Sequence, residues 1–184
     1  MTIDTVPYPR DLTDGVVRLR AYRDDDAEAL AEAVRESVAT AGPWLEWCTA
    51  DYDVATAQDW IRLCKQAWLL GDGFEMIIVD AETDRFLGGM GINQRHRQHR
   101  FANLGYWVRE SAQRRGLTTR AGKLALGFAF DVIGETRIEI VAAHDNWASR
   151  KAAERIGGRF EGLLRNRLII NGSPIDAAMY SVVP

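Results

Sequence analysis

The sequence predicts an α/β protein in which one mixed sheet is covered by helices on both of its faces. Strand-like and helix-like runs follow one another in the order β-α-α-β-β-β-α-β-α-β-β. Turns that contain glycine or proline separate many of these runs. With 184 residues, 47% of them hydrophobic, the chain is long enough to bury one sizeable core. We therefore expect a single domain over residues 1–184.

Seven segments have the pattern of strands and four have the pattern of helices. The strand segments alternate apolar and polar residues or are continuously apolar, and the helical segments repeat apolar residues every three or four positions. The predicted strands cover residues 16–20, 75–79, 85–93, 101–108, 137–142, 159–170 and 174–182. The predicted helices cover residues 27–38, 53–70, 119–133 and 146–156.

The boundaries of these elements rest on turn and cap residues. Residues 1–13 lack a periodic pattern, and we expect them to form a loose arm. Asp24–Asp26 place acids where the first helix begins, and Gly71 ends the second. Gly157-Gly158 ends the last helix, and the turn Asn171-Gly172 joins the two closing strands.

Composition and cysteine usage exclude several classes of protein. The net charge of −3 gives no sign of a nucleic-acid partner. Cys48 and Cys64 form no CxxC pattern, so we expect neither a metal site nor a disulfide framework, and a reducing compartment is the default. No stretch has the roughly 18 apolar residues of a membrane span, and the N-terminus lacks the pattern of a signal peptide. We expect a cytoplasmic protein without a membrane partner.

Charge is distributed unevenly along the chain. Residues 1–90 hold 8 basic and 18 acidic side chains, whereas residues 91–120 hold seven arginines and one acid. Such polarity draws a polyanionic small molecule into one cleft. Arg95, Arg97 and Arg100 are expected to lie on a solvated hairpin instead.

The most informative stretch, residues 105–120, joins an apolar strand to a helix through a polar turn. This turn carries Gln113, Arg114, Arg115 and Gly116. The start of a helix has unpaired backbone N–H groups and the positive end of the helix dipole, which suit a bound phosphate. Glycine also lets a phosphate approach the backbone closely. The alternative is an ordinary capped helix.

A second polar stretch, Asn146 to Arg150, begins a helix at the end of the following strand. Ligands of such sheets favour the carboxyl ends of strands where the strand order splits, so both stretches point to the same edge. Together they indicate a cofactor-dependent transferase. Asn146 and Ser149 also suit capping of the helix, and the two roles are compatible.

Five motifs occur in order along the chain. They are Leu104-Gly105-Tyr106-Trp107-Val108, Gln113-Arg114-Arg115-Gly116-Leu117-Thr118, Asn146-Trp147-Ala148-Ser149, Arg155-Ile156-Gly157-Gly158 and Phe160-Glu161-Gly162. This combination resembles the GCN5-related N-acetyltransferase (GNAT) superfamily, in particular its RimJ/RimL-like branch, over essentially the whole chain. The resemblance implies an α/β (α+β) fold with a mixed, mostly antiparallel sheet of six to seven strands, splayed at the cofactor cleft. It also implies acetyl-CoA as the cofactor.

The resemblance assigns most cofactor contacts to the backbone of the polar turn, which opens at Gln113. The N–H groups that would hold the diphosphate belong to Arg114, Arg115, Gly116, Leu117, Thr118 and Thr119. An N–H near Trp107 or Val108 would polarise the thioester carbonyl, while the pantetheine arm pairs with that strand. Asn146 would bind a pantetheine amide. Thr118 stands where the family more often has Gly or Ala.

The resemblance also suggests groups for the transfer step. Many members place a Tyr seven positions after the Asn, but this chain has Ala153 there. Ser149 is therefore expected to donate a proton to the thiolate or to position the sulfur. Glu46, Glu75 and His144 are the candidate bases, and a water wire is the alternative.

Aromatic and polar residues are candidates for the acceptor side of the site. Trp44 and Trp47 flank Glu46, and a Trp pair beside an acid suits an ammonium group through cation–π contact. Asn93 and Tyr106 are the other candidates for substrate binding, although Tyr106 also fits a plain core position.

The resemblance implies direct acetyl transfer to a primary amine, without a covalent enzyme intermediate. The acceptor is a protein N-terminus, including that of a ribosomal protein, or a small amine. One alternative is a non-catalytic acyl-CoA-binding or sensor domain. A domain that binds RNA through the arginines of residues 91–120 is a weaker one. Members of this branch are often homodimers.

Overall fold

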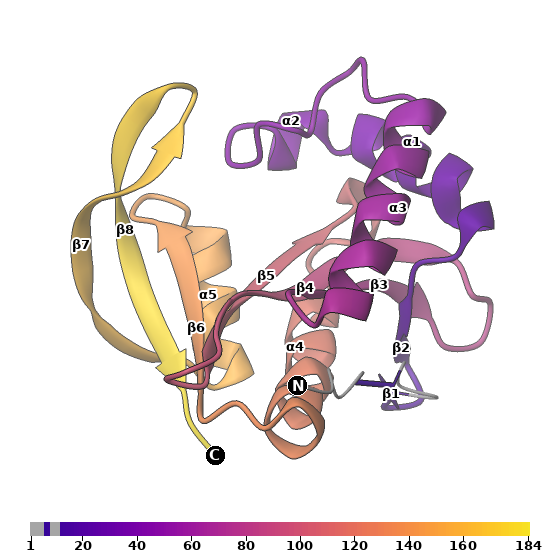
Figure 1. Cartoon of the computed structure of the whole chain (residues 1–184). Helices are drawn as coiled ribbons and strands as arrows, with labels where there is room; N and C mark the ends of the chain where they lie inside the picture. Colours follow the sequence, from indigo (N-terminus) through magenta and orange to yellow (C-terminus); the bar gives the residue numbers. More distant parts are fainter. Residues whose placement is uncertain (1–5, 8–11) are drawn as a thin grey trace.

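The strands of the chain form one eight-stranded sheet, seen in a computed structural model that describes residues 6–7 and 12–184 (Figure 1). The strand order is β1-β2-β3-β4-β5-β6-β8-β7. The strands are β1 (Leu12–Thr13), β2 (Val17–Ala21), β3 (Phe74–Asp80), β4 (Phe86–His96), β5 (Phe101–Val108), β6 (Arg137–Ala143), β7 (Arg159–Ile170) and β8 (Ser173–Val182). Neighbouring strands are antiparallel, except that β5 and β6 run parallel.

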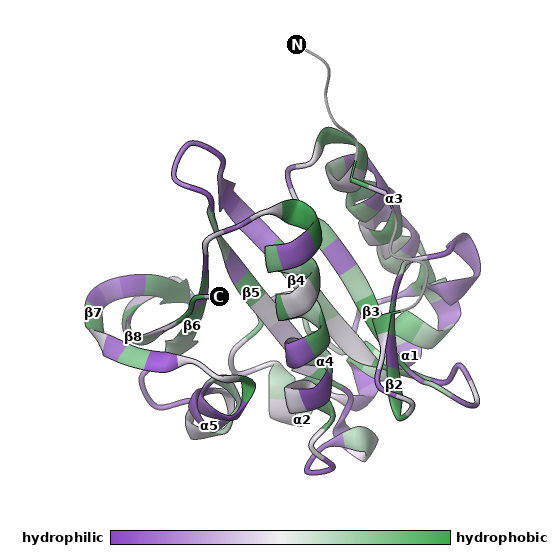
Figure 2. Cartoon of the chain, turned by 90° about the horizontal axis from the view of Figure 1, so that it is seen from below, coloured by the Kyte–Doolittle hydropathy of each residue, from purple (hydrophilic) through white to green (hydrophobic). Residues whose placement is uncertain are grey.

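Helices cover both faces of the sheet (Figures 1 and 2). They are η1 (Asp24–Asp26), α1 (Ala27–Glu36), α2 (Val38–Ala41), α3 (Val54–Leu70), η2 (Glu110–Ala112), α4 (Leu117–Gly127), η3 (Phe128–Ile133) and α5 (Trp147–Ile156). The alternation of side chains along β3 divides two cores: Ile77 and Val79 pack with α1 and α3, while Met76 and Ile78 pack with α4 and α5. None of these helices combines the length and apolar character of a membrane span.

The long helix α3 shows why the sequence folds as it does on the first face. Its buried residues are spaced by three or four positions, which places them on one side of the helix: Ala57, Ile61, Cys64 and Trp68. Asp53 caps the start by accepting a hydrogen bond from the Thr56 backbone N–H at 2.8 Å. Gly71, with a φ of +65°, ends the helix in the left-handed conformation.

On the other face, a glycine sets the close packing of α4 and α5. A Cβ placed on Gly122 of α4 would lie 2.6 Å from Ile156 Cγ1 on α5, so a side chain there would force Ile156 to move. The contact fixes α5 beside α4 and brings the N-terminal ends of both helices to the same cavity, described below.

The predicted fold class is confirmed, with differences of detail. The seven predicted strands are all present, and the sheet has eight because Leu12 and Thr13 pair with Leu19 and Arg18. These two residues belong to the segment expected to be a loose arm, of which residues 1–5 and 8–11 lie outside the described part. The helix predicted over residues 119–133 begins at Leu117, and its last six residues form a π-helical turn.

The sheet opens into a wedge between β5 and β6. These strands pair only through Phe101–Asn103 of β5 with Arg137–Glu139 of β6. Beyond that point β6 continues to pair with β8, and β5 with β4, so the edges of Leu104–Val108 and Ile140–Ala143 face each other without pairing. The predicted splay is confirmed.

Candidate active site

A cavity of about 560 Å³ occupies the wedge. Its walls come from the unpaired parts of β5 and β6, the segment from Thr40 to Leu45, the polar turn before α4, the start of α5, and Leu168 and Ile170 of β7. The cavity therefore joins both halves of the sheet, and it contacts both stretches that the sequence singled out.

The polar turn presents a row of unpaired backbone N–H groups beside this cavity. Arg114 and Gly116 have φ values of +62° and +74°, so the turn is left-handed at both positions. The N–H of Gln113 donates to Glu110 O, and that of Arg120 donates to Gly116 O. Among the described residues, no hydrogen bond uses the N–H groups of residues 114–119. Six consecutive donors at the start of a helix suit a diphosphate.

Side chains hold this turn in place from behind. Gln113 Nε2 donates to Val108 O at 3.2 Å and to Thr40 Oγ1 at 3.1 Å, which ties the turn to β5 and α2. Gln113 lines the cavity, but its side-chain N–H groups already donate to Val108 O and Thr40 Oγ1, and its backbone N–H donates to Glu110 O. The structure therefore gives Gln113 a positioning contact to the strand.

A buried arginine, paired with two acids of α1, fixes the other side of the turn. Arg109 donates to Glu32 and Glu36 of α1, and the Ser111 N–H donates to Glu36 Oε1 at 2.6 Å. The Arg109 guanidinium lowers the pKa of Glu36 to about 2. Only 4% of Arg109 is exposed. Its place in the basic segment suggested a role in attracting a polyanion, but its charge instead pairs with the acids of α1.

Two other arginines of that segment have partners within the chain, Arg95 in the interior and Arg97 at the exposed surface, as expected for Arg97. Arg95 was expected on a solvated hairpin, but it pairs with the buried Glu135 at 2.6 Å and lies over the Phe74 ring. Arg97 pairs with Asp72. Arg114 makes no ion pair within the described chain and lines the cavity. Two basic residues of α5 that the sequence analysis missed, Lys151 and Arg155, line it too.

At the start of α5, capping and cavity lining coincide. Asn146 Oδ1 accepts a hydrogen bond from the Ser149 N–H at 3.0 Å, and both residues line the cavity. The Tyr106 hydroxyl donates to Ser149 O at 2.9 Å and lies 3.3 Å from Ser149 Oγ. Burial raises the pKa of Tyr106 to about 12, so this phenol stays protonated. Tyr106 thus brings a hydroxyl to the serine, although the helix position that bears Tyr in many relatives is Ala153.

The candidate bases and aromatic residues lie at different depths. Trp44 lines the cavity, whereas Trp47 packs edge-on against Trp107 at 5.5 Å between ring centroids and is 43% exposed. Glu46 is exposed and accepts a hydrogen bond from the Asn171 N–H in the β7–β8 turn. His144 is exposed and lies 3.9 Å from Asp145 Oδ1. Neither Glu46 nor His144 lines the cavity.

The third candidate base, Glu75, lies on β3 in a half-buried chain of polar side chains and does not line the cavity. Asn93 Nδ2 donates to Glu75 Oε1 at 2.8 Å, and Asn103 Nδ2 donates to Asn93 Oδ1 at 3.0 Å. Asn103 lines the cavity. Sequence reasoning missed Asn103, although its position two residues before Gly105 places both on one face of the strand.

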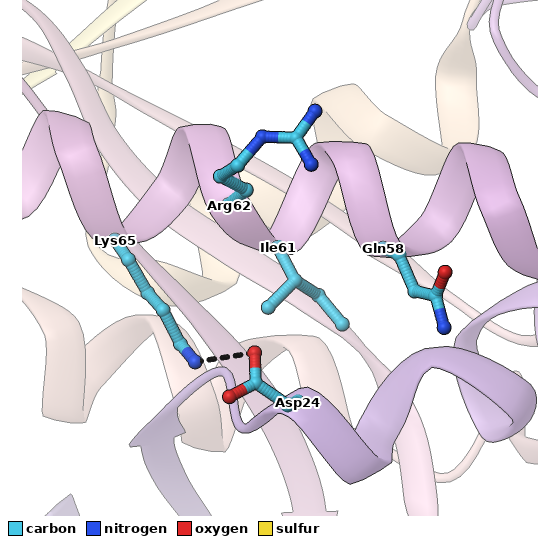
Figure 3. Close-up of a pocket in the computed structure, with 5 residues that line it drawn as sticks. All are labelled: Asp24, Gln58, Ile61, Arg62 and Lys65. Carbon is cyan, nitrogen blue, oxygen red and sulfur yellow. Dashed lines mark hydrogen bonds and ion pairs between the residues drawn. The ribbon is translucent and has the colours of Figure 1, made fainter.

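A second pocket, of about 320 Å³, lies between η1 and α3, away from the wedge (Figure 3). Asp24 and Lys65 bridge it with an ion pair at 2.6 Å, and the side chain of Ile61 lies between the two elements. It contains none of the residues of the polar turn or of α5.

A splayed α/β sheet with a free helix N-terminus at the split has the arrangement expected of a transferase that binds an acyl-CoA. Comparison with known families gives the particular one: the chain belongs to the acetyltransferase (GNAT) domain family, whose profile matches residues 17–159. It is an N-acetyltransferase of the RimJ/RimL type with acetyl-CoA as acetyl donor. The predicted family, activity and cofactor are confirmed.

Three relatives illustrate this membership. The candidate ribosomal N-acetyltransferase YdaF of Bacillus subtilis (strain 168) is 29% identical over 91% of each chain. The ribosomal-protein-serine acetyltransferase of Escherichia coli (strain K12) is 27% identical over 59% of this chain and 61% of that one. The solved structure of Mycobacterium smegmatis RimJ in complex with CoA-disulfide is 27% identical, covers 98% of this chain and 87% of that one, and has a TM-score of 0.84.

Proposed function

We propose that this enzyme acetylates the N-terminal amine of a protein, with ribosomal proteins as the substrate class. The observation that carries the proposal is the wedge, because the single cavity that borders the row of unpaired N–H groups is also lined by Trp44 and Ile170. The names of relatives support the ribosomal substrate. Ribosomes work in a reducing compartment, where cysteines stay as thiols. The two free, buried thiols of Cys48 and Cys64 fit such a cytoplasmic location.

In this proposal the backbone of the polar turn binds the cofactor. The N–H groups of residues 114–119 hold the diphosphate, with Arg114 supplying positive charge. The open edge of β5 pairs with the amides of the pantetheine arm. Asn146 Nδ2 is available to the same arm, because within the described chain only the oxygen of this side chain has a recorded hydrogen bond. Lys151 and Arg155 add positive charge to the wall.

The transfer step needs an oriented thioester and a donor near its sulfur. Bound acetyl-CoA supplies a carbonyl carbon that an amine nitrogen attacks. A backbone N–H at Trp107 or Val108 polarises that carbonyl. Ser149, held by Tyr106 and Asn146, lies on the α5 side of the wedge and positions or protonates the sulfur.

A thiol-release assay with acetyl-CoA tests this function. The acceptors are peptides with free N-termini from ribosomal proteins, the same peptides with a blocked N-terminus, and a panel of small amines. We expect CoA release with free peptides only, and a mass increase of one acetyl group at the N-terminal residue. Turnover with small amines alone would contradict the protein-substrate proposal.

Calorimetry separates the two alternative functions. CoA, acetyl-CoA and RNA are titrated into the enzyme at two salt concentrations. Tight CoA binding without turnover on any amine would favour the acyl-CoA sensor. RNA binding that weakens steeply with salt would favour the RNA-binding domain. Sedimentation in the same buffers tests the homodimer expected from the resemblance.

A further inference from the structure

The wedge has two open strand edges, and the proposed function uses only one of them. The pantetheine arm is assigned to the edge of β5, whereas residues 140–143 of β6 line the same cavity from the other side. Beyond Glu139, β8 is the only strand that pairs with β6 in the described chain. The side of β6 that faces the wedge therefore carries backbone groups without a strand partner.

The register of β6 on β8 shows which groups these are. In an antiparallel pair, alternate residues direct their N–H and C=O groups to the partner strand, and the residues between them direct theirs to the other side. The His144 N–H donates to Asp176 O of β8 at 2.9 Å, one position beyond the last paired residue of β6. Residues 142 and 140 therefore bond β8 as well, while Val141 and Ala143 direct their groups into the wedge.

Three of these groups are free, and they lie at the level of the reaction. The fourth, the Ala143 carbonyl, accepts a hydrogen bond from the Asn146 N–H at 3.0 Å. The N–H and C=O of Val141 and the N–H of Ala143 have neither a strand nor a side chain as partner in the described chain. When the parallel register of β5 and β6 is continued past its last pair, Val141 falls opposite Gly105 and Ala143 opposite Trp107. The free groups therefore face the part of β5 proposed to polarise the thioester.

The walls of the cavity assign the two edges to different substrates. Gln113 ties the polar turn to the end of β5 through Val108 O, so a donor held by this turn continues along β5. The charged residues of the lining come from the turn and α5, whereas all the lining residues that β6 and β7 contribute are apolar. An uncharged wall with free N–H and C=O groups on a strand edge suits an extended polypeptide.

We propose that the open edge of β6 binds the acceptor polypeptide as a short added strand. This inference rests on the proposed function. The acceptor chain leaves past the open end of the wedge, so it runs parallel to β6 with its N-terminus toward the split. In this direction the N–H of its second residue donates to Val141 O, and the C=O of the same residue accepts from the Ala143 N–H. The terminal amine then lies beside Val141, across the wedge from Gly105.

The proposal narrows the substrate class. Acceptors are extended polypeptide N-termini whose second residue has a backbone N–H. A small amine lacks the second residue, and a chain with proline at that position lacks the donor. Neither completes the two bonds to β6, so both should be poor acceptors.

Replacement of one peptide amide by an ester tests this proposal on the wild-type enzyme, because an ester lacks the N–H and adds no bulk. One acceptor peptide carries the ester between its first and second residues, and the matched control carries it between its fourth and fifth. Since a neighbouring ester acidifies the terminal amine, rates are expressed per unprotonated amine. We expect kcat/KM to fall about tenfold for the first ester and to stay within twofold for the control.

Residue-resolved hydrogen exchange locates the added strand on the enzyme. The Ala143 N–H should exchange more slowly with CoA and an unmodified acceptor peptide than with CoA alone, while the Ala142 N–H, bonded to β8, should not change. Two results would overturn the proposal: equal rates for the two ester peptides, or protection of Ala143 by CoA alone, which would give this edge to the donor. Wild-type enzyme that acetylates no peptide would instead remove the proposed function, and this inference with it.

Discussion

The substitution Gly116→Ala tests the phosphate turn most directly, because the chain offers a matched control in Gly134→Ala. Both glycines are left-handed, with φ of +74° and +80°, and a Cβ on either meets no atom within 4 Å. Neither variant therefore creates a clash, and each costs about 1–2 kcal/mol of strain. The two variants should lower the melting temperature by similar amounts.

The two variants should differ in their affinity for CoA. The added methyl group at position 116 projects into the open space beside the unpaired N–H groups, where a phosphate would lie, whereas position 134 follows η3, outside the residues that line the cavity. Loss of one charge-assisted hydrogen bond costs about 1.5–3 kcal/mol, or about 10–150-fold in the dissociation constant. Isothermal calorimetry with CoA measures this constant. Equal affinities of the two variants would refute the assignment of the phosphate site to this turn.

Three further predictions address the remaining contacts. Ser149→Ala should lower kcat about 10–100-fold and leave the affinity for CoA unchanged, as measured by steady-state kinetics and calorimetry. An unchanged kcat would show that Ser149 does not act on the sulfur. Wild-type stability should fall as the pH drops from about 5 toward 2, because Arg109 holds the pKa of Glu36 at about 2, below its unfolded value of 4.5. The free energy of unfolding of Glu36→Gln, measured by urea titration, should fall by about 1–2 kcal/mol less than that of the wild type over this range. The difference is no larger because solvent screens the partly exposed carboxylate. Parallel curves of stability against pH for the two proteins would contradict this prediction. Glu46→Ala removes the bond to the Asn171 N–H and should raise the KM for peptides about fivefold while leaving the KM for CoA unchanged.

Local sequence patterns were enough to predict most of the fold and the cofactor side of the site. Strand and helix periods predicted all seven longer strands, because each strand has one or two buried faces. The turn at Gly116 was recognisable because a left-handed glycine before a helix leaves a local composition signal. The two-residue β1 has no such signal, since its pairing with Leu19 is tertiary.

Contacts between distant residues were not predictable in the same way. Arg109 and Arg95 looked like part of a basic surface, yet their partners Glu36 and Glu135 lie 73 and 40 residues away in the sequence. Asn103 was missed because its role depends on Asn93 across a strand pair, and strand register does not follow from composition.

Main-chain atoms, rather than side chains, form the row of donors at residues 114–119. Side chains along this segment can therefore change during evolution while the backbone geometry at Arg114 and Gly116 persists. The ability to bind a diphosphate then depends on the shape of the turn and not on the identity of its side chains. Selection for a new acceptor then falls on the opposite wall, where one or two codon changes near Gly105 alter the depth of the pocket. Lineages of this fold can diversify their targets without re-inventing the means of holding the donor.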